Sequence, residues 1–286
     1  MSINCQAKQK FMEDELKDIK KGGVKLNLLL NANCYGAKAL SEELENNVIK
    51  IIDYLFTNIG LDIVTTTSLF LAKRIKANFP LLEIRASVNM ETASVSAMRY
   101  VKEYFDSFYL ARRLNRYPEA IEPLKTWCEA NNKKLFLLAN SGCLRECSAH
   151  NFHDNLVSHE HEIKNHKNIW QGFMGVCWDY FCNPENHYRF IADSNWLRPE
   201  DIDEYSGLVD GIKLATRVHM MPEKVIAAYA QRNFEGNTLS LLEPDFSSLR
   251  YIENSAFPNS WITQLSNLNN KKYDKCCQEI FTHVKR

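Results

Sequence analysis

The chain has 286 residues, of which 45% are hydrophobic and 24% are charged, and this is an ordinary globular composition. Lys+Arg and Asp+Glu are both 35, so the formal net charge is zero, which argues against a large nucleic-acid interface or a polybasic membrane surface. No apolar run approaches the roughly 18 residues of a membrane span. The polar start, MSINCQAKQKFMEDELKD, lacks the apolar region of a secretory signal. We therefore expect a cytoplasmic protein with no membrane partner.

The nine cysteines are the unusual part of the composition. They are far too sparse for a disulfide scaffold, which needs roughly 8–10% cysteine, and a chain of this length buries a core without cross-links. In a reducing compartment thiols serve as metal ligands, catalytic groups or plain core residues. Their positions along the chain therefore decide what they indicate.

Short apolar runs alternate with helical segments through the first half of the chain. A charged helix is predicted over 9–21, ended by Gly22 and Gly23. Ser41 is a suitable N-cap for one of the later helices. After Gly23, strand-like runs are predicted over 26–32, 61–67, 82–88, 105–111 and 134–140. The helical segments between them are 41–55, 68–79, 93–104 and 118–131. Strands that are apolar on both faces are typical of a parallel sheet.

An excursion without clear periodicity, 141–195, interrupts this alternation. A further strand, 209–215, and a helix beginning at Pro222 follow it, and a polar tail, 236–286, completes a single predicted domain over 1–286. The order suits an open doubly wound sheet or a barrel. Because neither G-x-G-x-x-G nor a Walker P-loop occurs, we predict an α/β fold of the TIM-like (β/α) barrel type, incomplete or distorted, with the Cys/His-rich excursion as an insertion.

Two cysteine pairs lie in the excursion. Cys143 and Cys147 form C-x3-C, and Cys177 and Cys182 form C-x4-C. Four thiolates suit Zn²⁺ or the irons of a [4Fe-4S] cluster, although small buried hydrophobes are an equal alternative from spacing alone. Other cysteines are open substitutes as ligands: Cys34, Cys276 and Cys277.

Two histidines and one cysteine are further candidates for chemistry. His153 and His159 lie near the expected barrel mouth, where a pKa close to neutrality suits acid–base work. Cys34 follows the first strand, and barrels place their active sites at the carboxyl ends of the strands. It is a candidate nucleophile, a candidate ligand, or a packed side chain.

Three charged residues in the last third also stand out. Arg198, in WLRPEDI, either holds a substrate carboxylate or belongs to an ordinary helix start with Pro199 and acidic residues. Lys213 lies between apolar residues in GIKLATR, where a charge is costly unless paired. Lys213 either binds an anionic group in the barrel or pairs with an acid such as Glu83. Arg217 lies at the carboxyl end of the same predicted strand.

Several ordered blocks over most of residues 24–255 resemble the U32 family, named for its putative peptidases. The blocks are LNLLLNANCYG, LARRLNR, NSGCLRECSAHNFHDNLVSH, WLRPEDIDEY and GIKLATR. The resemblance implies a barrel-like fold. It also implies one of two activities, because some members are called collagenase-like proteases and others act in oxygen-independent hydroxylation with a [4Fe-4S] cluster on four cysteines. Cys143, Cys147, Cys177 and Cys182 match those ligands.

Three hypotheses of function follow. The first is a cluster-dependent enzyme that modifies a small molecule, RNA or peptide in a pocket containing His153, His159, Arg198, Lys213 and Arg217. The second is a peptidase, in which Cys34 or Cys143 pairs with His159, or which uses a metal. The third is a non-catalytic subunit with a structural metal site. Some hydroxylating relatives work as heterodimers, so a homo- or heterodimer is an open alternative, and the substrate is unknown.

Overall fold

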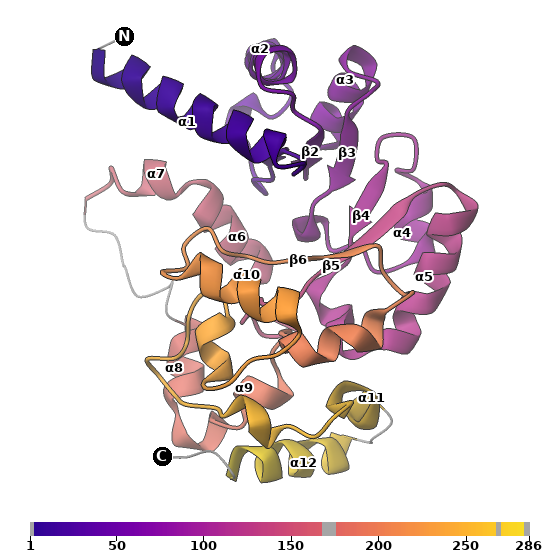
Figure 1. Cartoon of the computed structure of the whole chain (residues 1–286), viewed down its shortest axis with the longest axis vertical. Helices are drawn as coiled ribbons and strands as arrows, with labels where there is room; N and C mark the ends of the chain where they lie inside the picture. Colours follow the sequence, from indigo (N-terminus) through magenta and orange to yellow (C-terminus); the bar gives the residue numbers. More distant parts are fainter. Residues whose placement is uncertain (1–2, 168–175, 267–269, 283–286) are drawn as a thin grey trace.

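The computed structural model describes residues 3–167, 176–266 and 270–282 (Figure 1). Its six strands form one parallel sheet in the order β1-β2-β3-β4-β5-β6. Their bounds are β1 Asn27–Leu30, β2 Ile63–Thr66, β3 Glu83–Ala86, β4 Ser107–Tyr109, β5 Lys134–Leu138 and β6 Gly211–Lys213. Among the described residues β1 and β6 do not pair, so the sheet curls without closing. The predicted incomplete TIM-like barrel is confirmed as a half-barrel.

The helices predicted before the first strand and between the first five strands are also confirmed, the first one longer and the fourth one shorter than predicted. They are α1 Ile3–Lys21, α2 Glu42–Asn58, α3 Leu69–Asn78, α4 Val95–Arg99 and α5 Pro118–Ala130. The Ser41 side chain accepts a hydrogen bond from the Leu44 N–H, as a helix N-cap does. The helix predicted over 93–104 ends at Arg99, because bonds to the third residue back replace the α-helical pattern beyond it, as from Tyr104 to Val101.

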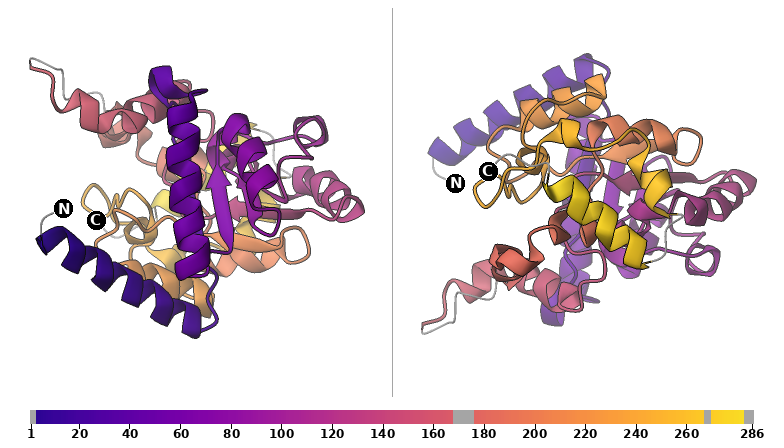
Figure 2. Two further views of the ribbon diagram at one scale, coloured as in Figure 1. Left: turned by 90° about the horizontal axis from the view of Figure 1, so that it is seen from above. Right: turned by 90° about the horizontal axis from the view of Figure 1, so that it is seen from below.

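The excursion and the tail contain short helices that the sequence periodicity does not predict. They are α6 His150–Ser158, α7 Glu160–Ile163, α8 Val176–Cys182, α9 Arg189–Ala192, α11 Trp261–Ser266 and α12 Asn270–Thr282, while α10 Pro222–Gln231 is the predicted helix after β6. Figure 2 shows α6 and α7 reaching outward from the body of the molecule. Among the described residues no helix is long and apolar enough to cross a bilayer.

The C-terminal segment is part of the core rather than a polar appendage. Leu239, Phe246 and Trp261 are almost fully buried and belong to the same apolar cluster as strand residues such as Ile84 and Leu137. Burying one such side chain contributes roughly 1.5–3 kcal/mol. The Phe246 ring lies so close to Gly142 that a side chain there would collide with it, which fixes the backbone just before Cys143.

The carboxyl ends of the strands bring together chemistry from distant parts of the sequence. Cys34 follows β1, Glu91 follows β3, Arg112 follows β4, Cys143 follows β5 and Arg217 follows β6. Because all six strands are parallel, these loops lie at one edge of the sheet. This is the edge where (β/α) barrels carry their active sites.

Candidate active site

A cysteine, a histidine and a glutamate form a chain of contacts at this edge. The Cys34 thiol lies near the His159 imidazole, close enough for each group to shift the pKa of the other. On its other side, His159 Nδ1 lies 2.9 Å from Glu162 Oε2. Cys34 is half-buried and the His159 side chain is 27% exposed, so both groups are accessible to a substrate. A nucleophile, a base and a group that orients the base are the three parts of a cysteine hydrolase site.

The electrostatics of this group favour the reactive form of the thiol. The nearby His159 imidazole lowers the pKa of the Cys34 thiol, and the Gly36 N–H, 3.3 Å from the sulfur, lowers it further. Cys34 in turn raises the pKa of His159, and the contact with Glu162 adds to the rise. Both shifts stabilise a thiolate–imidazolium pair, and the thiolate is the nucleophilic form of cysteine.

Hydrogen bonds made by the residues just before Cys34 and His159 hold these two side chains close to each other. The Asn33 N–H donates to Ser158 Oγ at 2.9 Å, and the Asn33 side-chain amide donates to Asp154 Oδ2 at 3.2 Å. Asn33 directly precedes Cys34, and Ser158 directly precedes His159. These bonds therefore attach α6 to the loop after β1 and align the two reacting groups.

A cavity of about 370 Å³ is lined by sequence neighbours of Cys34 and His159, but not by those two residues themselves. Ala32 and Tyr35 beside Cys34 line it, as does Ser158 beside His159. Leu30 adds an apolar wall, and Arg217 contributes a charged side chain. Asn31, Asn89 and Asp154 also line the cavity, so it is more polar than the usual small-molecule site.

Lys213 lies behind this region with no carboxylate in contact. Its ammonium group is 5.1 Å from the centroid of the Tyr109 ring, and it forms no ion pair with a described residue. Burial lowers the pKa of Lys213 to about 8, and the positive charges of Arg112 and Arg217 lower it further. The alternative pairing with Glu83 is not formed, because Glu83 contacts Arg85 at 2.8 Å and Lys134 at 3.5 Å.

Two of the four predicted cluster ligands line a second cavity, and a third lies near them. This cavity of about 290 Å³ is lined by Cys143, Cys147 and Arg112 among others. The Arg112 guanidinium donates to Cys143 Sγ at 3.5 Å. Burial raises the pKa of Cys177, and the nearby thiols of Cys143 and Cys147 raise it further. We call Cys143, Cys147 and Cys177 the thiol group.

The fourth predicted ligand does not join the thiol group. Cys182 is exposed at the end of α8. Within the part of the chain that the structure describes, no set of three or more His, Cys, Asp or Glu side chains is arranged to hold a metal ion. The fit to a four-thiolate cluster is therefore incomplete. Of the substitutes, Cys277 is buried in the core, where burial raises its pKa to about 12, and Cys276 is half-buried beside it.

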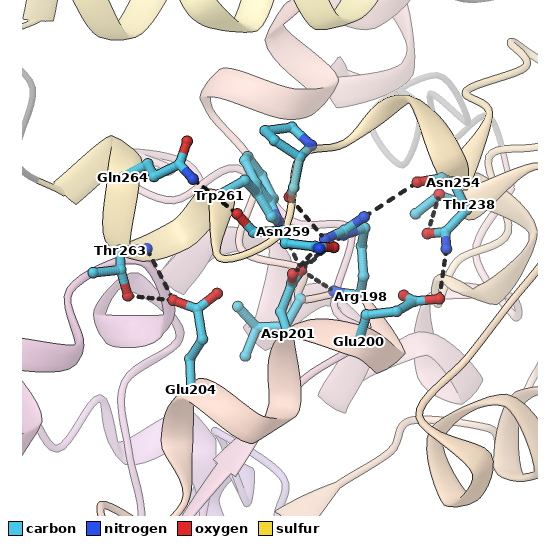
Figure 3. Close-up of polar contacts among 12 residues, drawn as sticks. Arg198, Glu200, Asp201, Glu204, Thr238, Asn254, Asn259, Trp261, Thr263 and Gln264 are labelled. Carbon is cyan, nitrogen blue, oxygen red and sulfur yellow. Dashed lines mark hydrogen bonds and ion pairs between the residues drawn. The ribbon is translucent and has the colours of Figure 1, made fainter.

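Arg198 lies in a buried ion pair rather than in either cavity. Its guanidinium contacts Asp201 at 2.7 Å, and both side chains are at most 4% exposed. Trp261 Nε1 donates to the same carboxylate, and Arg198 also donates to the Asn254 carbonyl (Figure 3). Asp201 bonds back to the Arg198 N–H at the start of a 3-10 helix. Of the two roles open from sequence, the structure places Arg198 in the helix start.

The other predicted residues divide between the two regions. His159 and Arg217 adjoin the Cys34 cavity, and Lys213 lies behind it. His153 is half-buried on α6 and near Asp154, whose pKa it helps to lower. Sequence reasoning missed Asn33 and Glu162. The spacing of Glu162 three residues after His159 on a helical segment was an available signal, whereas nothing in the sequence marks Asn33.

The chain is similar to known proteins, although no protein-family model matches it. It is 28% identical over 286 aligned positions to an uncharacterized protease, MJ1657, of Methanocaldococcus jannaschii, spanning 94% of this chain and 80% of that protein. Among solved structures, the U32 peptidase Mk0906 matches with a TM-score of 0.49 and 16% identity over 71% of this chain and 73% of that one. The similarity to MJ1657 therefore extends along nearly the whole chain.

Proposed function

We propose that the protein is a cysteine-dependent peptidase in which Cys34 is the nucleophile and His159 is its acid–base partner. The observation that carries this proposal is the grouping of Cys34, His159 and Glu162 at the carboxyl edge of the sheet. His159 lies near Cys34 and contacts Glu162 at 2.9 Å, next to a cavity of about 370 Å³. The relative from Methanocaldococcus jannaschii is named a protease, which agrees with amide hydrolysis.

In this proposal Cys34 reacts first, and His159 transfers the protons of the later steps. The Cys34 thiolate attacks the carbonyl carbon of the scissile amide, and a carbon–sulfur bond forms. The His159 imidazolium then donates its proton to the leaving amine, and the carbon–nitrogen bond breaks. Water hydrolyses the acyl-enzyme, with His159 accepting a proton from it. Glu162 holds the imidazole by Nδ1 throughout and stabilises its charged form.

A hydrolysis assay tests the proposal. A library of internally quenched peptides is incubated with the wild-type protein, with Cys34→Ser and with Cys128→Ser. Cys128 is a fully buried core thiol on α5 and serves as the matched control. We expect cleavage that Cys34→Ser lowers at least about 1,000-fold and that Cys128→Ser retains. Cleavage that survives Cys34→Ser would refute the proposal.

A second candidate function uses the thiol group. Cys143, Cys147 and Cys177 lie near one another, and Arg112 beside them would offset the negative charge of thiolates. We propose them as ligands of an iron–sulfur cluster, with Cys182 or an external group as the fourth. When bound, a [4Fe-4S] cluster supplies electron transfer, as the oxygen-independent hydroxylation implied by the family resemblance requires. Zinc is the alternative metal.

Anaerobic purification distinguishes these metals. About four irons and four sulfides per chain, lost in Cys143→Ala but kept in Cys34→Ala, is the result expected for the cluster. Zinc without sulfide would refute the cluster and leave a zinc site. A stable protein without any metal would identify the thiol group as packed core cysteines.

A further inference from the structure

Three cationic side chains come from the carboxyl ends of β4 and β6, on either side of β5. Arg217 lines the cavity next to Cys34. Lys213, four residues earlier on β6, lies close enough to Arg217 and Arg112 for both charges to act on its ammonium group. We call Arg112, Lys213 and Arg217 the basic group.

Most carboxylates of the region are already in ion pairs. Glu91 contacts Arg113 at 3.1 Å, and Asp154, which lines the cavity, contacts His150 at 2.9 Å. Both carboxylates also contact Arg112 at 3.7 Å. Glu243 acts on Lys213, but its carboxylate accepts a hydrogen bond from the Val218 N–H at 3.3 Å. Among the described residues Lys213 and Arg217 form no ion pair, so theirs are the positive charges left without a contacting carboxylate.

One member of the basic group is paired, and the other two are not. Arg112 contacts the carboxylates of Glu91 and Asp154 at 3.7 Å, although its buried Nη2 has no hydrogen-bond partner among the described residues. Lys213 is half-buried, and its ammonium group faces the Tyr109 ring rather than a carboxylate. A cation partly removed from water without a contacting anion is costly, and an anion bound near Lys213 and Arg217 would reduce that cost.

We infer that the Cys34 site selects substrates with a negatively charged group, a carboxylate of an acidic side chain or of a chain end, beside the bond that reacts. Arg217 contacts this group directly from the wall of the cavity. Lys213 and Arg112 do not touch this group, and they attract it through the electrostatic potential of their positive charges. The inference rests on the proposed function, since it names the substrate class of the same site.

Alkylation of Cys34 tests the inference without requiring hydrolysis. Iodoacetate and iodoacetamide react with a thiolate in the same way, since a sulfur–carbon bond forms and iodide leaves, but only iodoacetate is an anion. The folded protein is labelled with each reagent and then digested, and mass spectrometry of the peptides gives the rate at Cys34. The wild-type protein and Arg217→Gln are compared. Arg232→Gln is the matched control, because Arg232 pairs with Asp203 on the surface after α10.

We expect the iodoacetate-to-iodoacetamide rate ratio at Cys34 to fall about 3- to 10-fold in Arg217→Gln and to stay unchanged in Arg232→Gln. The wild-type ratio should also fall as salt rises, because screening weakens the field. Equal ratios in the wild type and Arg217→Gln would overturn the inference.

A peptide pair then separates this inference from the proposed function. Peptides that differ only by Glu or Gln at each position around the cleaved bond are compared by kcat/KM. A preference for Glu at one position, lost in Arg217→Gln, supports the inference. Cleavage that depends on Cys34 but ignores the charge overturns the inference and keeps the peptidase. If no peptide is cleaved, the peptidase proposal fails, and the alkylation ratio still decides whether the site attracts anions.

Discussion

Two groups of cysteines lie at the same edge of the half-barrel, and their surroundings differ. Cys34 is next to an imidazole and a backbone N–H, which lower its pKa. Cys177 in the thiol group is half-buried, and its partial burial, together with two nearby thiols, raises its pKa. The first environment favours a thiolate that attacks; the second keeps the thiol protonated until a cation takes its place. The reactivity expected of each cysteine therefore depends on the groups next to its thiol rather than on its position in the half-barrel.

The largest expected effect comes from His159→Gln. Removing the imidazole abolishes the acid–base step and the neighbouring group that lowers the pKa of Cys34, so peptide hydrolysis should fall roughly 10²- to 10⁴-fold. Alkylation of Cys143 should not change, because His159 does not contact it. Steady-state kinetics and peptide mass spectrometry measure the two effects. A matching loss of reactivity at Cys143 would show that the two regions are not independent.

Lys213→Met should stabilise the protein. The folded-state pKa of about 8 lies below the ordinary value of 10.5, so protonation favours the unfolded chain, fully so below pH 8. Removing the amine should raise the free energy of unfolding at pH 7 by roughly 1–3 kcal/mol and have little effect near pH 11. Urea unfolding at both pH values measures this. If Lys213→Met were less stable than the wild type at pH 7, the conclusion that protonated Lys213 destabilises the folded protein would be wrong.

Ser158→Ala should reduce the alignment of Cys34 with His159 and leave the thiol group as it is. The lost hydrogen bond from the Asn33 N–H is worth about 1 kcal/mol, so kcat should fall about 5- to 10-fold and the pKa of Cys34 should rise toward its ordinary value. Ser96→Ala, at an exposed serine of α4, is the control. An unchanged pH profile of alkylation would show that Ser158 has no positioning role.

The smallest effect is expected from Arg112→Gln at the thiol group. The guanidinium that donates to Cys143 stabilises the thiolate, so its loss should slow alkylation of Cys143 by about 2- to 5-fold. Alkylation of Cys34 by the uncharged iodoacetamide should change less. Competitive labelling followed by mass spectrometry measures both rates in one sample. An equal slowing at both cysteines would remove the distinction between the regions.

The sequence predicted the strands because each is a short apolar run between helical segments, and the position of Cys34 after the first run followed directly. The pairing of Cys34 with His159, 125 residues later, depends on how α6 lies across the sheet. Asn33 and Ser158 fix that arrangement, and neither has a local pattern. The sequence left two roles open for Arg198 for a related reason: a buried ion pair with Asp201 and a group that binds a substrate carboxylate need the same residue types.

The reactivity of all the cysteines as a function of pH tests the central claim most directly. Native protein is labelled briefly with iodoacetamide from pH 5 to 10, and modification of each thiol is measured by mass spectrometry. We predict that Cys34 reacts first, with a midpoint below the ordinary thiol pKa that rises in His159→Gln, while Cys177 reacts only at higher pH. If Cys34 instead titrates at or above the pH at which Cys143 and Cys147 react, it is not an activated nucleophile and the account is wrong.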